Sequence, residues 1–126
     1  MDLVYIEDNP INVLLVRELL SLRPQVTLHT APNGRSGVAL ALSLRPRVVL
    51  IDMQLPDIDG FEVLRRLRAE PSLAASPLIA LSANGLTEDI ARAMAAGFDD
   101  YWTKPINLPR FLSRIDQLQR GDPYVR

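Results

Sequence analysis

Five times along the chain, a short run of β-branched and aliphatic residues gives way to a longer amphipathic stretch. This alternation predicts a parallel sheet with crossover helices, because a helical bundle or a β-sandwich would not change its hydrophobic period in this way. The first and third runs are apolar at every position, which is typical of strands covered on both faces. The predicted strands are Leu3 to Ile6, Val26 to Thr30, Val48 to Ile51, Leu78 to Leu81 and Tyr101 to Thr103.

Four of the predicted helices begin with a recognisable signal. Asn9 with Pro10 is typical of an N-cap followed by the first helical residue. Asp59 and Glu62 resemble a capping box. Acidic residues follow Thr87, and Asn107 opens the last helix. The second helix, around 37–44, has the weakest amphipathic pattern.

The length of 126 residues is that of one domain, long enough to fold without covalent or metal staples. We expect the domain to occupy residues 1–120, and residues 121–126 to form a C-terminal tail or the start of a linker. The chain has no cysteine, which excludes disulfides, thiolate metal sites and a cysteine nucleophile.

Charge and hydropathy exclude two classes of partner. The 15 acidic and 14 basic residues are interspersed and nearly cancel, so this domain is not expected to bind nucleic acid or an anionic membrane. No apolar run approaches the ~20 residues that would span a bilayer, and the first residues lack the basic flank of a secretory signal. The expectation is a soluble, cytoplasmic protein without membrane contact.

Two single residues stand out in the composition. Every basic residue is arginine except Lys104, which suggests a position that arginine cannot fill. The one histidine, His29, lies in an alternating strand pattern and is interpreted as an ordinary strand residue.

Polar residues follow four of the five predicted strands. Because the carboxyl ends of parallel strands meet at one edge of a sheet, these side chains should lie together, where open α/β folds bind ligands. They are Glu7 and Asp8 after the first strand, Asp52 after the third, Ser82 after the fourth and Lys104 after the fifth.

Three clustered carboxylates repel one another and require protonation or a cation. Ligands that are all oxygen suit Mg²⁺, which would be held by Glu7, Asp8 and Asp52, with the Gln54 backbone carbonyl as a further ligand. Asp52 is the candidate nucleophile toward phosphorus. Lys104 would supply a compact positive charge, and Ser82 a hydrogen bond to a phosphoryl oxygen.

Four segments, in order along the chain, resemble the receiver domain of two-component response regulators and hybrid histidine kinases. The resemblance extends from Leu3 to about Leu118. The segments are Ile6-Glu7-Asp8-Asn9, Ile51-Asp52-Met53-Gln54-Leu55-Pro56-Asp57-Ile58-Asp59-Gly60, Leu81-Ser82-Ala83-Asn84 and Gly97-Phe98-Asp99-Asp100-Tyr101-Trp102-Thr103-Lys104-Pro105.

The resemblance implies a flavodoxin-like, doubly wound sheet of five parallel strands in the order 2-1-3-4-5, with five helices. It implies that Asp52 accepts a phosphoryl group from a phosphohistidine, with Mg²⁺, on a histidine kinase or a histidine phosphotransfer protein. Such a domain is a stoichiometric phosphoacceptor that catalyses its own phosphorylation and dephosphorylation, not an enzyme with turnover. The Lys104–Pro105 bond would be cis, directing the lysine toward the site.

The resemblance also implies a switch. Ser82 would move toward the phosphoryl group and Tyr101 would turn inward behind it, changing the face formed by the fourth helix, fifth strand and fifth helix. That face is a possible homodimer interface. The Glu7-Asp8-Asn9-Pro10 opening is similar to receivers of hybrid kinases.

Some positions depart from the usual receiver pattern. Glu7 stands where many receivers have aspartate, and Ser82 where threonine is more frequent. Gln54 and Asn84 occupy positions that control water access to the phosphoryl group. The lifetime of the phosphorylated form, the cognate kinase and the output therefore stay open.

Three alternatives remain at this point. A haloacid-dehalogenase-like phosphatase would need a second acid where Gln54 stands, and an FMN-binding flavodoxin would need a hydroxyl- and glycine-rich loop in place of Glu7-Asp8. A degenerate receiver would bind a partner without phosphorylation. Outside the site, Asp57 and Asp59 are interpreted as turn and cap residues, Asp99 and Asp100 as a solvated turn, and Trp102 as packing.

Overall fold

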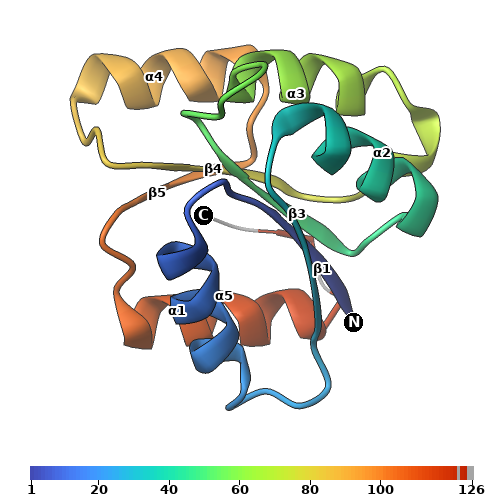
Figure 1. The fold of residues 1–126 in the computed structure, drawn as a ribbon, viewed down its shortest axis with the longest axis vertical. Coiled ribbons are helices and arrows are strands. Elements are labelled where there is room, and N and C mark those ends of the chain that lie inside the picture. Colours follow the sequence, from blue (N-terminus) through green and yellow to red (C-terminus); the bar gives the residue numbers. More distant parts are fainter. Residues whose placement is uncertain (122, 125–126) are drawn as a thin grey trace.

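Helices cover both faces of a five-stranded sheet in the computed structural model, which describes residues 1–121, 123 and 124 (Figure 1). The strands are β1 (Asp2–Ile6), β2 (Thr27–Ala31), β3 (Val48–Asp52), β4 (Leu78–Ser82) and β5 (Asp100–Thr103). The helices are α1 (Pro10–Leu20), α2 (Gly34–Leu44), α3 (Gly60–Arg68), α4 (Thr87–Ala96) and α5 (Leu108–Gln119), with a short 3-10 helix at Pro71–Leu73.

All neighbouring strands are parallel and their order is β2-β1-β3-β4-β5. The predicted fold class and strand order are therefore confirmed. The register brings the strand ends to nearly the same level: Ile6 lies opposite Ile51, one residue before the end of β3, and Ser82 lies opposite Thr103. This alignment places the residues that follow β1, β3, β4 and β5 at one edge of the sheet.

The sheet separates two hydrophobic cores, because successive strand residues point to opposite faces. Val4, Ile6, Val49 and Ile51 pack on the side covered by α2, α3 and α4. Leu3, Tyr5, Leu50 and Leu81 pack on the side covered by α1 and α5. Every residue of β3 is buried.

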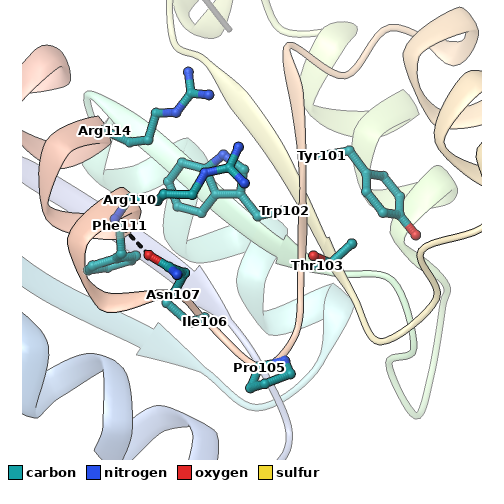
Figure 2. A pocket seen from close by; sticks show the side chains of 9 residues that line it. All are labelled: Tyr101, Trp102, Thr103, Pro105, Ile106, Asn107, Arg110, Phe111 and Arg114. Carbon is teal, nitrogen blue, oxygen red and sulfur yellow. Dashed lines mark hydrogen bonds between the residues drawn. The ribbon is translucent and has the colours of Figure 1, made fainter.

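The two aromatic residues of β5 lie on opposite faces of the sheet. Figure 2 shows Tyr101 on one side of the strand and Trp102 on the other. The Trp102 ring packs edge-to-face on Phe111 of α5, with centroids 5.8 Å apart. Arg110 and Arg114 line the same cavity as Trp102, whose volume is about 110 Å³.

Most helix starts follow the predicted signals. The side chains of Asn9, Asp59 and Asn107 each accept a backbone N–H in the first turn of α1, α3 and α5, at 2.9 to 3.0 Å. The Glu62 side chain instead accepts hydrogen bonds from Arg65 and Arg66. No side chain caps α4.

Helix α2 begins three residues earlier than the sequence pattern indicates. The Asn33 side chain accepts the backbone N–H of Ser36 at 2.8 Å and starts the helix at Gly34. The pattern missed this turn because Gly34 and Gly37 carry no hydrophobic signal, although both are buried.

The prediction of a solvated turn is wrong for Asp100, whereas Asp99 lies in a bend and its side chain is 39% exposed. Asp100 is a buried residue of β5, and its carboxylate accepts hydrogen bonds from the Tyr101 backbone (2.8 Å), the Trp102 indole (2.9 Å) and the Tyr124 hydroxyl. Asp99 is half-buried and accepts the backbone N–H of Leu78 at 2.7 Å. Donors from β5 itself and from distant parts of the chain therefore hold both carboxylates in place.

The predicted C-terminal tail is described only in part. Tyr124 packs against the core on the α1 and α5 side and donates its hydroxyl to Asp100. The positions 122, 125 and 126 of that prediction lie outside the described residues. In the part of the chain that the structure describes, no helix has the length and apolarity needed to cross a membrane.

Candidate functional site

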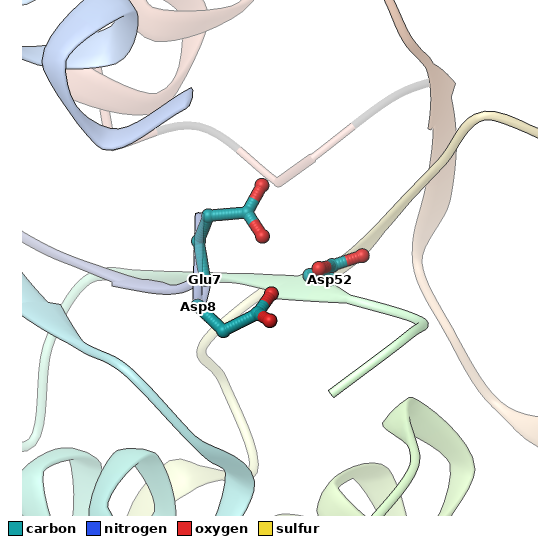
Figure 3. A group of neighbouring side chains, drawn as sticks. All are labelled: Glu7, Asp8 and Asp52. Carbon is teal, nitrogen blue, oxygen red and sulfur yellow. The ribbon is translucent and has the colours of Figure 1, made fainter. Parts of the chain in front are cut away.

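Three carboxylates meet at the carboxyl edge of the sheet. Glu7 and Asp8 follow β1, and Asp52 is the last residue of β3, so the predicted neighbours do lie together. One oxygen from each lies within 4.8 Å of the others. Glu7 and Asp52 are buried and Asp8 is exposed; Figure 3 shows the two β1 acids side by side, across from Asp52. The cluster is therefore open to solvent on the Asp8 side.

Lys104 lies between the two buried acids. Its Nζ is 2.8 Å from Glu7 Oε1 and 3.4 Å from Asp52 Oδ1. Its backbone N–H donates to the Ser82 carbonyl at 2.9 Å, and the Lys104–Pro105 peptide is cis, as expected from the resemblance. The lone lysine of the sequence is thus a cation of the site.

Two site residues were missed by sequence reasoning. The Tyr5 hydroxyl donates to Glu7 Oε1 at 3.0 Å, and Asn12 Nδ2 donates to the same oxygen at 2.8 Å. Tyr5 lies on β1, two residues before Glu7, and Asn12 lies in the first turn of α1. The period-two spacing was the available signal for Tyr5, but a tyrosine in an apolar strand suggested only packing.

The two buried acids, Glu7 and Asp52, differ in their pKa values. Burial, together with a hydrogen bond to Glu7, raises the pKa of Asp52 from 3.8 to about 7. Burial opposes ionisation of Glu7 as well, but hydrogen bonds involving Asp52, Lys104 and Asn12 outweigh it and lower its pKa to about 2. Burial thus favours the protonated form of Asp52, whereas the hydrogen bonds to Glu7 favour the ionised form of Glu7.

The remaining predicted residues are Gln54, which contacts Asp52, and Ser82 and Tyr101, which are linked through Asn84. The Gln54 backbone N–H donates to Asp52 Oδ1 at 3.1 Å, while its carbonyl as a metal ligand stays a prediction. Ser82 is buried at the end of β4, and its hydroxyl accepts the Asn84 N–H at 3.1 Å. The Tyr101 hydroxyl donates to the Asn84 carbonyl at 2.6 Å. These four residues line a cavity of about 200 Å³.

The donor set fits a hard divalent cation. All three side chains offer carboxylate oxygens, and the exposed Asp8 leaves room for water or phosphoryl oxygens in the remaining positions. A cation there would favour the ionised form of Asp52, which is the form able to attack phosphorus. The site is suited to receiving a phosphoryl group beside the Lys104 ammonium.

Comparison with known proteins gives the family. Residues 3–116 match the model of the response regulator receiver domain. The chain is 36% identical over 110 residues to the polar-differentiation response regulator DivK of Brucella anthropi, covering 87% of this chain and 89% of that protein. It is 33% identical over 121 residues to the transcriptional regulator RpaA of Synechocystis, covering 94% of this chain but only 48% of RpaA.

Solved structures agree with this result. The receiver domain of the sensor histidine kinase PA1611 from Pseudomonas aeruginosa, described with a magnesium ion coordinated in its active-site cleft, superposes with a TM-score of 0.82 at 32% identity. That match covers 96% of this chain and 98% of the other. The receiver domain of a histidine kinase from Syntrophus aciditrophicus gives a TM-score of 0.83 at 28% identity, over 99% and 94% of the two chains.

Neither the phosphatase nor the flavodoxin alternative is supported by these matches, which agree with one another over nearly the whole sequence. From its fold and its relatives, the chain belongs to the family of response regulator receiver domains, the phosphoacceptors of two-component signalling.

Proposed function

We propose that Asp52 is the phosphoacceptor of this receiver domain, with Mg²⁺ held by Glu7, Asp8, Asp52 and the Gln54 carbonyl. The observation that carries the proposal is the position of Asp52, buried within 4.8 Å of two further carboxylates and 3.4 Å from the Lys104 ammonium. A charged lysine beside a buried acid cluster fits the transfer of a dianionic group better than a structural role.

The transfer forms one bond and breaks another. An Asp52 carboxylate oxygen attacks the phosphorus of a phosphohistidine, an O–P bond forms, and the N–P bond breaks with its electron pair leaving on the imidazole nitrogen. When bound, the metal offsets negative charge on the transferred oxygens. Lys104 contributes the second positive charge, and Ser82 donates a hydrogen bond to a phosphoryl oxygen. Hydrolysis returns Asp52 to its carboxylate, so the domain acts stoichiometrically.

Receiver domains interact with histidine kinases or phosphotransfer proteins, and the phosphohistidine donor of this chain is proposed to dock on α1. Its residues Ile11, Leu14 and Leu15 are apolar and 75%, 57% and 42% exposed. Ile11 is three residues from Asp8, so a donor seated on this surface can reach the site. Ile11→Ser should slow transfer from the donor protein and leave phosphorylation by a small phosphodonor unchanged.

The output face is proposed to be α4, β5 and α5, which also provides a surface for pairing with a second copy. Tyr101, on β5, is bonded to the Asn84 carbonyl beside Ser82, so a shift of Ser82 toward a phosphoryl group would act on the contact that holds the ring. Glu88 and Asp89 at the start of α4 and Arg110 on α5 supply opposite charges for such pairing.

We also propose the domain boundaries, the cellular location and the parent protein of this chain. We assign residues 1–120 to the receiver domain, as the family match over residues 3–116 supports, and residues 121–126 to a tail or linker. A phosphoryl supply that starts from ATP on a kinase supports a cytoplasmic location. The Glu7-Asp8-Asn9-Pro10 opening supports a hybrid histidine kinase as parent chain.

The phosphoacceptor assignment is tested by labelling. Wild-type protein incubated with Mg²⁺ and phosphoramidate should gain the mass of one phosphoryl group, and Asp52→Asn should gain none because an amide cannot form the acyl phosphate. Glu70→Gln, which removes a half-buried carboxylate outside the site, is the control and should label normally. Equal labelling of Asp52→Asn would refute the assignment, and no labelling of the wild type would favour a degenerate receiver.

A further inference from the structure

The loop between β3 and α3 is hydrogen-bonded to α2, a helix that contributes no residue to the acid cluster. Within that loop, the Asp57 carboxylate accepts two backbone N–H groups at the start of α2, from Gly34 at 2.7 Å and from Arg35 at 2.9 Å. The Arg35 guanidinium lies 3.9 Å from the same carboxylate. Asp57 thus joins the segment that follows Asp52 to the N-terminus of α2.

The charge on Asp57 strengthens this attachment. Partial burial works against ionisation, but backbone hydrogen bonds from Arg35, Ile58 and Gly34 outweigh it and lower the pKa of Asp57 to about 2. The carboxylate is therefore ionised at neutral pH and faces the positive end of the α2 dipole.

Helix α2 also touches both chain segments that carry the acid cluster. A Cβ added to Gly34 would lie 2.4 Å from Ile58 Cγ1, in the loop after Asp52. A Cβ added to Gly37 would lie 2.4 Å from Ile6 Cδ1, in the residue before Glu7. A larger residue at either position would require an isoleucine to move, so the helix packs directly on both segments.

The far end of the loop is fixed as well. The Gly60 N–H donates to the Met53 carbonyl at 3.4 Å, and a Cβ at Gly60 would lie 2.5 Å from Met53 Sδ. The Gln54 backbone therefore lies in a short segment closed at Met53 and anchored through Asp57.

We infer that Asp57 is a positioning residue for the metal site, holding the Asp52–Gln54 segment at its place relative to Glu7 and Asp8 through α2. The inference rests on the proposed function and extends it to a residue outside the acid cluster. Removing the anchor should loosen the Asp52 and Gln54 ligands without changing any ligand itself, as loss of supporting hydrogen bonds does at other metal sites.

Calorimetric titration of the protein with MgCl₂ tests this role. Asp57→Asn keeps the size of the side chain but loses its charge and one acceptor, and should weaken Mg²⁺ binding by roughly tenfold. Asn33→Ala removes the other side-chain cap of α2 and leaves the loop anchor intact, so it should bind Mg²⁺ like the wild type. Urea denaturation should show that both variants stay folded and lose comparable stability.

A second variant tests the contact between α2 and the loop by adding a methyl group on the helix. Gly34→Ala favours helix formation by α2 but pushes on Ile58, so it should also weaken Mg²⁺ binding severalfold. Ile58→Ala in the same chain removes the colliding Cγ1 and should restore part of the affinity.

The outcomes separate the two proposals. Wild-type affinity in both Asp57→Asn and Gly34→Ala would overturn the positioning role while leaving the metal site in place. An equal loss in Asn33→Ala would also overturn it, because helix stability alone would then explain the effect. If the wild type binds no Mg²⁺, the proposed metal site itself fails.

Discussion

Glu7 accepts hydrogen bonds from Tyr5, Asn12 and Lys104 while lying next to a second buried carboxylate. These donors lower the pKa of Glu7, while burial and the contact with Glu7 raise the pKa of Asp52. Under the proposed function, a bound cation would favour the carboxylate form of Asp52, which is the form that attacks phosphorus. The longer glutamate arm reaches all three donors and still keeps one oxygen near Asp8 and Asp52.

This arrangement makes stability depend on pH in a defined direction. The pKa of Asp52 is higher in the folded state, so the folded protein binds the proton more tightly and loses stability as pH rises from about 4 to about 7. Glu7 and Asp57 act in the opposite sense, but only at lower pH, as it falls toward about 2. In EDTA, unfolding by urea should show a loss on the order of 2 kcal/mol between about pH 5 and pH 7.5.

Asp52→Asn provides the control for that measurement. The amide has no proton to lose, so the variant should lack this part of the decline and be more stable than the wild type at about pH 7.5. A decline of the same size in both proteins would assign the effect to other groups.

The sequence was sufficient to predict that residues are neighbours where they lie at the ends of parallel strands. Glu7, Asp52 and Lys104 follow parallel strands, so topology fixes their proximity. Asn12 and Asp100 could not be found in this way, because their roles depend on the direction and reach of a side chain and on donors supplied by the fold.

At the scale of the elements, α2 is a support for the site and its packing explains why its sequence pattern is weak. The helix uses glycine to approach Ile6 and Ile58, and glycine leaves no trace in an amphipathic pattern. Its start was consequently misplaced, whereas α1 and α5, whose asparagine caps and following prolines are explicit in sequence, were placed correctly.

Gly37→Ala should destabilise the protein although alanine favours helix formation. The new Cβ would meet three Ile6 side-chain atoms at 2.4 to 2.7 Å, and overpacking of this kind costs about 1 to 3 kcal/mol. Gly85→Ala is the matched control, because its Cβ would come only within 3.5 Å of Thr103 Cγ2. Urea denaturation of the two variants measures the difference, and equal stabilities would show that Ile6 moves aside freely.

Over the whole molecule, strand order is what turns scattered polar residues into one site. β1 and β3 are neighbours at the centre of the sheet, with β4 and β5 beside them, so residues from position 7 to position 104 meet at one edge. A net charge of −1 gives no sign of this local excess of acid. The alternating strand and helix pattern was sufficient to predict the fold class, and the polar residues after the strands were sufficient to predict the edge that carries the site.

Binding at that edge should stabilise the entire domain. A ligand that binds only the folded state at one hundred times its dissociation constant adds about 2.7 kcal/mol. Thermal denaturation with saturating MgCl₂ should therefore show an increase in Tm of several degrees, and Asp8→Ala should abolish the increase. An undiminished increase in Asp8→Ala would place the metal elsewhere.

The division of the β5 aromatic residues between the two cores has an optical consequence. The chain has one tryptophan, and its indole packs on Phe111 and donates to Asp100 on the face of β5 opposite Tyr101. Fluorescence excited at the red edge of indole absorption therefore comes from a single position on this strand. The protein carries an intrinsic, label-free reporter beside its proposed output face, in a core separate from the ring that is proposed to move.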